Sequence, residues 1–250
     1  MSTFEISKVD AASSTAYLVH TTGVNWVILQ DDSGITLIDG GYPGNVDDVI
    51  GSIEQIGARP SDLRAALLTH AHVDHLGGLQ KLLQRFDFPV YADPDEVAHA
   101  HRDRLQQAGP LDIAAVAWSP RTWRWLAMVA PLGVLSRTGI DTAQSFPTAG
   151  ALDLPGLPRP VSAHGHTDGH SAFLVADGEV LVSGDALISG HPLSGHRGPQ
   201  LLPRFFNHDD AATRRSVEAY AELTATVLFP GHGPRLDGPI ADLAHAALAR

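Results

Sequence analysis

The sequence has 250 residues, of which 44% are hydrophobic and 18% charged, and a formal net charge of −11. This acidity argues against a nucleic-acid partner, because the protein would repel phosphate backbones. The absence of cysteine excludes disulfides, thiolate nucleophiles and zinc–thiolate sites. The start, MSTFEISKVDAASS, lacks a signal-peptide pattern, and no apolar run reaches membrane-spanning length. We therefore expect a cytoplasmic protein without a membrane partner.

The N-terminal third predicts strands and then a helix. Three short apolar or alternating runs, separated by turn residues, are typical of a strand meander; they cover residues 16–20, 25–30 and 35–39. The stretch 45–57 has apolar residues at helical spacing and stops at Gly57, a residue type that often follows a helix. A strand, a helix and a strand are predicted next, over 64–70, 77–86 and 89–92.

The middle segment, residues 95–147, fits neither the strand pattern nor a polar linker. It is helical in places and carries three of the four tryptophans, Trp118, Trp123 and Trp125. It is either additional core or an apolar cap over a pocket. We treat residues 1–250 as a single domain in which this segment is a cap or insertion.

The second half again alternates strands and helices. Strands are expected over 159–165, 171–177, 179–185 and 225–233, and helices over 210–223 and 240–249. A hairpin turn is predicted at Asp177–Gly178. Two strand-rich halves with helices outside them predict an α/β protein with a four-layer αββα sandwich.

The segment THAHVDHLGG gathers side chains that can bind a metal. Residues two apart on an extended segment point to the same side, so His70 and His72 can face one cation. Asp74 and His75 come after the chain turns, between Val73 and Asp74, and can face a second point. The following glycine pair allows a close backbone approach as the next helix begins.

Further ligands must come from elsewhere, and three side chains at the ends of β runs are available. These are His166, Asp185 and His232. Loops at strand ends usually present functional groups. Nitrogen and carboxylate ligands without thiolate suit Zn²⁺, Mn²⁺, Fe²⁺ or Co²⁺, and the carboxylate of Asp185 could bridge two ions.

The motifs LIDGG, THAHVDHLGG, HGHTDGHS, LVSGD and FPGHG, in this order, resemble those of the metallo-β-lactamase-fold superfamily of hydrolases. The resemblance spans about residues 15–235 and implies the αββα fold. It also implies two metal ions. The first would be held by His70, His72 and His166, the second by Asp74, His75 and His232, and Asp185 would bridge them. The resemblance also implies that Asp39 supports the site without touching a metal.

Other residues are candidates for contact with a substrate: His170, His191, His196, Trp123 and Trp125. In similar glyoxalase-II-like proteins, the histidine at the place of His170 is usually a supporting residue. His99 and His101 share the H-x-H spacing but lie on an expected helix, where neighbours two apart diverge. We interpret them as a solvated helix face.

The resemblance implies two divalent ions, zinc first among the candidates, and a bridging hydroxide that attacks the substrate, with Asp74 orienting it or passing a proton. We expect a small ester, lactone or thioester with an apolar acyl part. Many similar lactonases carry a tyrosine three residues after the bridging aspartate, whereas this sequence has Ile188. A homo-oligomer is compatible with the sequence.

The main alternative is an oxidoreductase of the persulfide-dioxygenase type with one iron. Such proteins tend to lack a functional second site, so the presence of His75 and His232 favours two metals. β-Lactamase, phosphodiesterase and non-catalytic binding functions are less favoured. A binding protein on this fold should have lost ligands, and all seven positions are filled.

Overall fold

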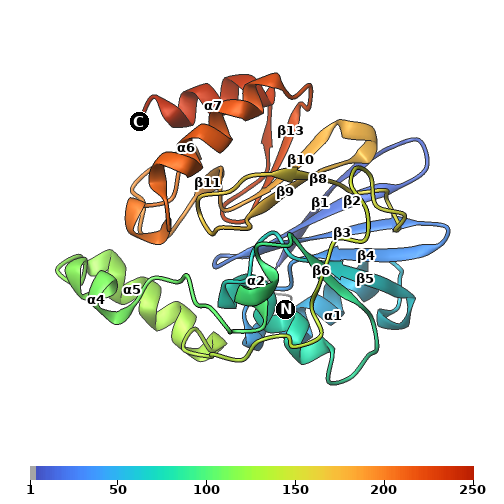
Figure 1. Cartoon of the computed structure of the whole chain (residues 1–250), viewed down its shortest axis with the longest axis horizontal. Coiled ribbons are helices and arrows are strands. Elements are labelled where there is room, and N and C mark those ends of the chain that lie inside the picture. Colours follow the sequence, from blue (N-terminus) through green and yellow to red (C-terminus); the bar gives the residue numbers. More distant parts are fainter. Residues whose placement is uncertain (1–3) are drawn as a thin grey trace.

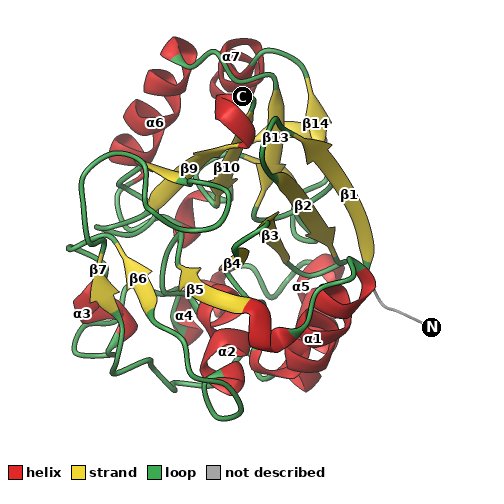
Figure 2. Cartoon of the chain, turned by 90° about the vertical axis from the view of Figure 1, so that its right-hand side faces the viewer, coloured by secondary structure: helices red, strands yellow, loops and turns green. Residues whose placement is uncertain are grey.

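The computed structural model describes residues 4–250 and stacks four layers (Figure 1). Helices α1 and α2 cover one sheet, a second sheet packs on that sheet, and helices α6 and α7 cover the second sheet (Figure 2). The αββα sandwich predicted from the strand pattern is confirmed. Among the described residues, no helix combines the length and hydropathy needed to cross a bilayer.

The first sheet has seven strands in chain order. They are β1 (Glu5–Asp10), β2 (Thr15–His20), β3 (Asn25–Asp31), β4 (Gly34–Ile38), β5 (Leu63–Leu67), β6 (Val90–Ala92) and β7 (Gln144–Ser145). Strands β2 to β4 form the predicted antiparallel meander, β1 adds a further antiparallel strand that was not predicted, and β4 to β7 pair in parallel. The carboxyl ends of β4, β5 and β6 therefore meet at one edge, which is where parallel sheets usually place functional groups.

The second sheet has the order β14-β13-β10-β9-β8. Its strands are β8 (Arg159–Ser162), β9 (Ser171–Val175), β10 (Val180–Gly184), β13 (Val227–Pro230) and β14 (Leu236–Asp237); a separate ribbon pairs β11 (Ile188–Gly190) with β12 (Arg197–Gln200). Only β10 and β13 pair in parallel. The predicted turn between β9 and β10 is confirmed, because Asp177 and Gly178 both have positive φ, at 56° and 88°.

The α-helices are α1 (Val46–Gln55), α2 (Val73–Leu82), α3 (Val97–Ala100), α4 (Pro110–Ala115), α5 (Pro120–Val129), α6 (Asp210–Ala219) and α7 (Ile240–Leu248). One-turn 3-10 helices lie at Pro43–Asn45, Pro60–Asp62, Ala130–Leu132, Ala176–Gly178, Arg204–Phe206 and Tyr220–Glu222. Helix α1 ends as predicted, with Gly57 just beyond it at a φ of 83°.

Helix α2 begins four residues before the predicted start at Gly77. His72 is still extended, and the helix starts at Val73. The turn therefore precedes Val73 rather than following it, and Asp74 and His75 belong to the first helical turn. The buried residues Val73, Leu76 and Leu79 recur every three residues, which is the spacing of a buried helix face.

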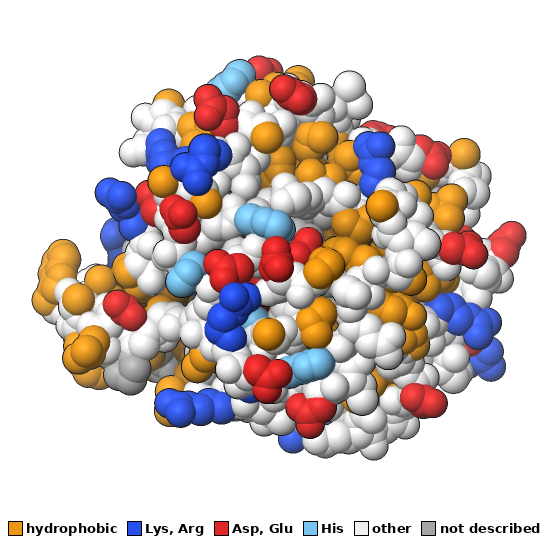
Figure 3. All heavy atoms as spheres, viewed as in Figure 1, with side chains coloured by type: hydrophobic (Ala, Val, Ile, Leu, Met, Phe, Trp, Pro, Cys, Tyr) orange, Lys and Arg blue, Asp and Glu red, His pale blue; other side chains and the backbone are white. Residues whose placement is uncertain are grey.

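The middle segment divides into parts with different roles. Strand β7 extends the first sheet, whereas α4 and α5 project from the body of the molecule (Figure 1). The buried face of α5, with Trp125 and Val129, packs on Tyr42 and Val73. Exposed hydrophobic side chains gather along this segment, and Figure 3 shows such side chains at the projecting end.

Candidate metal centre and active site

Five loops bring the predicted ligands and Asp39 to one edge of the two packed sheets. In the first sheet, Asp39 follows β4 and His70 to His75 follow β5. In the second, His166 lies between β8 and β9, Asp185 follows β10 and His232 follows β13. Because each sheet has parallel strands ending here, residues far apart in sequence converge.

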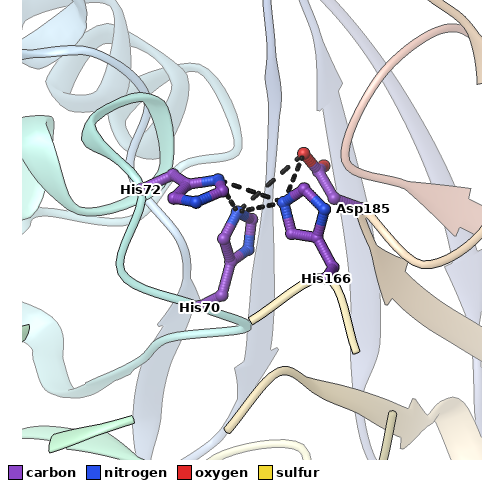
Figure 4. A group of neighbouring side chains, drawn as sticks. All are labelled: His70, His72, His166 and Asp185. Carbon is purple, nitrogen blue, oxygen red and sulfur yellow. Dashed lines mark hydrogen bonds and ion pairs between the residues drawn. The ribbon is translucent and has the colours of Figure 1, made fainter. Parts of the chain in front are cut away.

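One group of side chains comprises His70, His72, His166 and Asp185, all buried. Figure 4 shows the three rings and the carboxylate pointing toward one another. His72 Nδ1 lies 3.0 Å from both His70 Nε2 and His166 Nε2, and the last two atoms are 3.2 Å apart. The Oδ2 atom of Asp185 lies 3.5 Å from His166 Nε2 and 3.9 Å from His70 Nε2.

The second group comprises Asp74, His75 and His232. Asp74 Oδ2 lies 3.5 Å from His232 Nε2 and 3.9 Å from His75 Nε2. Asp185 also reaches this group, with Oδ1 3.3 Å from His75 Nε2 and Oδ2 3.2 Å from His232 Nε2. Asp185 is thus the side chain that lies between the two groups.

Each of the five histidines has its other ring nitrogen hydrogen-bonded away from the centre. The outward pairs are His70 Nδ1–Thr69 Oγ1 (3.1 Å), His72 Nε2–Gln106 O (2.6 Å), His75 Nδ1–Asp39 Oδ2 (2.8 Å), His166 Nδ1–Asn207 Oδ1 (3.0 Å) and His232 Nδ1–Gly23 O (2.8 Å). Carbonyl and carboxylate oxygens only accept, so the outward nitrogen carries the proton. The Thr69 hydroxyl donates to Asp39 and therefore accepts from His70. In the neutral rings, the inward nitrogens are left with lone pairs.

This donor set fits divalent cations. The inward nitrogens of the first group are 3.0–3.2 Å apart, close to the roughly 3.3 Å expected around a tetrahedral ion with nitrogen ligands. His75 Nε2 and Asp185 Oδ1 are buried and face each other at 3.3 Å, and neither makes any other hydrogen bond. Lone pairs and carboxylates facing one another repel unless a cation lies between them.

In the metal-free chain, the histidine pKa values shift in opposite directions in the two groups. Burial, reinforced by neighbouring histidines, holds the pKa of His70 and His72 well below the usual value. Burial is the largest influence and acts to lower the pKa of His75 and His232, but the neighbouring carboxylates, Asp185 first among them, together outweigh it and raise both pKa values. Burial would raise the pKa of Asp185, yet His232 and His75 hold it well below its usual value.

Asp39 lies behind the histidines rather than among the inward atoms. Its Oδ2 accepts hydrogen bonds from His75 Nδ1 at 2.8 Å and the Thr69 hydroxyl at 2.7 Å, and its Oδ1 accepts from the Thr69 backbone at 2.8 Å. Asp39 therefore ties the loop after β4 to the ligand loop after β5.

A cavity of about 400 Å³ opens over both groups. Asp74, Asp185 and His232 line its base, and apolar side chains from the middle segment line its wall. Trp125, which is 7% exposed, belongs to this wall. Trp123 does not, because it is 62% exposed and its indole donates to the carbonyl of Ala117. The structure therefore gives no support to the expectation that Trp123 contacts the substrate, which stays a prediction.

Of the three histidines predicted to contact the substrate, one lines the cavity and two do not. His191 lines the cavity, with its ring 5.1 Å from that of His232 and 6.1 Å from that of Trp125. His170 is fully buried and accepts a hydrogen bond from the Asp185 backbone N–H at 3.0 Å, so it supports that loop instead. His196 also lies outside the cavity lining.

Several residues at the site were not identified from the sequence. Tyr42 lines the cavity, is almost fully buried and shares a hydrogen bond with Asp74; burial and that carboxylate raise the pKa of Tyr42. Its position three residues after Asp39 was the only local signal. His99, expected on a solvated face, is fully buried against Glu96. An acid and a histidine three residues apart, shortly after a strand, could have indicated this pair.

Comparison with known proteins gives consistent matches. A family model described as the metallo-beta-lactamase superfamily matches residues 21–232. The chain is 27% identical over 222 residues to a probable metallo-hydrolase, YflN, of Bacillus subtilis, covering 84% of this chain and 79% of that protein. It is 31% identical over 166 residues to a hydroxyacylglutathione hydrolase of Alkalilimnicola ehrlichii, covering 66% and 48%. A metallo-β-lactamase family protein of Thermus thermophilus superposes with a TM-score of 0.61 at 20% identity, covering 100% and 79%.

Proposed function

The chain belongs to the metallo-β-lactamase superfamily and is a metal-dependent hydrolase. We propose that it uses two metal ions to cleave a small ester, lactone or thioester with an apolar acyl part. The observation that carries the proposal is the position of Asp185 between two groups of inward-facing ligand atoms at the base of an apolar cavity.

The proposed ligands are those on which the geometry and the resemblance agree. His70, His72 and His166 would hold one ion, Asp74, His75 and His232 the other, and Asp185 both. Zinc is the first candidate, because nitrogen and carboxylate donors in buried sites suit it, and manganese, iron and cobalt are the alternatives. When bound, such ions supply a Lewis acid and make a water nucleophilic near neutral pH.

The side chains of the cavity would bind and orient the substrate. Asp74 is partly exposed at the base, where its carboxylate can accept or pass a proton. Tyr42 keeps its proton at neutral pH, so its hydroxyl can donate a hydrogen bond there. Similar lactonases often have a tyrosine at the position of Ile188, which is buried in β11 here. In this chain, the phenol that lines the cavity belongs to Tyr42, in the loop after β4.

The substrate class follows from the wall of the cavity. We propose that residues 95–147 act as a cap whose apolar side chains, among them Trp125 on the buried face of α5, accommodate an acyl or aromatic group. The hydroxyacylglutathione hydrolase relative supports a thioester as one member of the class.

Metal quantification paired with a substrate screen tests the proposal. We expect about two zinc or manganese ions per chain, and hydrolysis of some lactones, aryl esters or thioesters with longer acyl chains preferred. Phosphodiesters and β-lactams serve as the comparison substrates. One iron per chain with oxygen consumption would instead support the dioxygenase alternative and overturn the proposal.

A further inference from the structure

Glu96 is a fully buried carboxylate that belongs to neither group of ligand atoms. It lies four residues beyond β6, at the same sheet edge as the ligands. We propose that Glu96 is a positioning residue that, with His99, locks the two histidine-bearing loops together and fixes the ring nitrogen that His72 presents. The proposal rests on the proposed metal centre and concerns how the chain holds its ligands, not which substrate is cleaved.

The carboxylate of Glu96 joins segments that are far apart in sequence. Its Oε1 accepts hydrogen bonds from the backbone N–H of Ala71 at 2.7 Å and from His99 Nδ1 at 2.8 Å. Its Oε2 accepts from the Thr167 hydroxyl at 2.7 Å and from the Gly169 N–H at 3.1 Å. Ala71 lies between two proposed ligands and Thr167 follows a third, so one side chain holds both loops.

The surrounding backbone leaves this arrangement little freedom. A Cβ atom at Gly169 would lie 2.3 Å from the backbone nitrogen of Glu96, so the two segments approach too closely for a larger residue at position 169. Arg102 Nη1 donates to the Ala71 carbonyl at 2.7 Å. Both polar backbone groups of Ala71 are therefore held by residues 96–102.

A chain of hydrogen bonds continues from Glu96 to the ring of His72. His99 donates through Nδ1 to Glu96, which leaves Nε2 to accept from the Gln106 N–H at 3.4 Å. The Gln106 carbonyl in turn accepts from His72 Nε2 at 2.6 Å. His72 must then carry its proton on Nε2, and its Nδ1 lone pair faces the other two histidines.

The charge of Glu96 matters to these contacts. Burial would raise the pKa of Glu96, but the hydrogen bonds from His99, Thr167 and Ala71 outweigh it and lower that pKa. The ionised carboxylate offers only acceptors to its four donors. A glutamine of the same shape would turn an amide NH₂ group toward two of those donors, whichever way its side chain is flipped.

The first test compares Glu96→Gln with a matched control, Ser52→Ala. Ser52 is also buried and accepts a hydrogen bond from the Trp26 indole at 3.0 Å, but it lies on α1, away from the site. Zinc affinity is measured by competition with a chromophoric chelator, together with the absorption spectrum of the Co²⁺ form. We expect Glu96→Gln to weaken zinc binding about 10- to 100-fold and alter the Co²⁺ spectrum, since partners behind metal ligands have effects of this size. Ser52→Ala should lower the melting temperature yet change zinc affinity less than about twofold.

A milder pair of variants keeps the test informative if Glu96→Gln does not fold. Thr167→Val removes one donor to Glu96 without changing the size of the side chain, and Thr167→Ser restores the hydroxyl. We expect weaker zinc binding in the valine variant and recovery in the serine variant. Wild-type zinc affinity in every folded variant would overturn the positioning role. A wild-type protein that binds no divalent ion would overturn the proposed function, and the present inference with it.

Discussion

Asp185 lies close to ligand atoms of both proposed groups, with Oδ2 3.5 Å from His166 Nε2 and Oδ1 3.3 Å from His75 Nε2. We predict that Asp185→Asn keeps the fold, because the side chain retains its size, but lowers metal content to about one ion per chain or less. Activity should fall by more than about 100-fold, since even partners behind the ligands affect metal sites by about 10- to 100-fold. Metal analysis and circular dichroism on the same sample check this.

Asp62, which is partly exposed, offers a control with the same Asp-to-Asn substitution away from the site. It pairs with Arg59 at 2.9 Å on the surface, so Asp62→Asn should leave metal content and activity unchanged. Two ions per chain and full activity in Asp185→Asn would be incompatible with a bridging role for that carboxylate.

Two buried histidines predict how the metal-free protein responds to acid. Burial is the largest influence that lowers the pKa of His170 and of His191, each to about 3. In the unfolded chain a histidine takes up its proton near pH 6.5, so the unfolded state gains protons first as the pH falls. Each residue should then weaken stability by about 1.4 kcal/mol per pH unit below 6.5, or about 3 kcal/mol for both at pH 5.5.

The histidines with raised pKa values do not cancel this effect. The stabilisation from His75 and His232 is fully present below pH 6.5 and is lost only as the pH rises through their folded-state pKa. Urea unfolding in the presence of a chelator at pH 7.0, 6.5 and 5.5 provides the measurement. His191→Gln should remove about half of the fall, and an unfolding free energy that stays level to pH 5.5 would show the prediction to be wrong.

The sequence predicts which residues act together as ligands better than it predicts the hydrogen-bond acceptors that orient those ligands. His70 and His72 sit two apart on an extended run, so that pattern alone predicts a shared direction. The acceptors that orient the histidines carry no such signal. Gln106 accepts through its backbone and Asn207 lies 41 residues from His166, so both contacts depend on tertiary structure.

At the level of elements, local chemistry predicts how helices end and pack more reliably than where they begin. The close approach expected at the glycine pair is confirmed, because a Cβ at Gly78 would lie 1.9 Å from the carbonyl oxygen of Gly40. The start of α2 differs from the prediction, because the sequence interpretation places a turn between Val73 and Asp74 and the structure already has a helix there. That start matters, because it places Asp74 and His75 on a rigid helical turn.

Helix α5 carries two tryptophans in different environments: Trp125 is buried and lines the cavity, whereas Trp123 is mostly exposed. Substituting each in turn distinguishes a role in the cavity from a role at the surface. We predict that Trp125→Leu raises KM for substrates with apolar acyl chains about tenfold, because it removes part of the apolar wall. Trp123→Leu should leave KM unchanged, since that ring is mostly exposed. Steady-state kinetics across a series of acyl lengths make the comparison.

The expected pattern for Trp125→Leu is a loss that grows with acyl length. A lower melting temperature with unchanged KM for every substrate would assign Trp125 to the core beneath α5 only, where it packs with Val129 and Tyr42. Equal effects of the two substitutions would argue against the division of the helix into a buried and an exposed face.

For the whole molecule, the layer order follows from features that the sequence carries. Apolar runs with β character in both halves require two sheets, and amphipathic helices must cover their outer faces. The way in which the halves meet is not encoded locally. Residues between the sheets, such as Leu29 and Phe173, occupy ordinary apolar strand positions in the sequence. Their residue type does not indicate which sheet they pack against.

The site joins these two sheets, and this leads to a prediction about metal removal. The first sheet supplies His70 to His75, and the second supplies His166, Asp185 and His232. Ions bound between them stabilise the folded state only, by about 4 kcal/mol for a site held at 1,000 times its dissociation constant. For a chain of this size, 1 kcal/mol corresponds to about 2–4 °C, so chelation should lower the melting temperature by roughly 10 °C for each site that is emptied.

Calorimetry with and without chelator, followed by re-addition of zinc, makes the measurement. The melting temperature should recover on re-addition in the wild-type protein, and both the fall and the recovery should be smaller in Asp185→Asn, because that variant loses the carboxylate facing both groups. Amide hydrogen exchange should show the largest loss of protection at 69–75 and 164–170, one loop from each sheet. Complete metal removal without any change in melting temperature would mean that contacts between the sheets alone hold the two halves together.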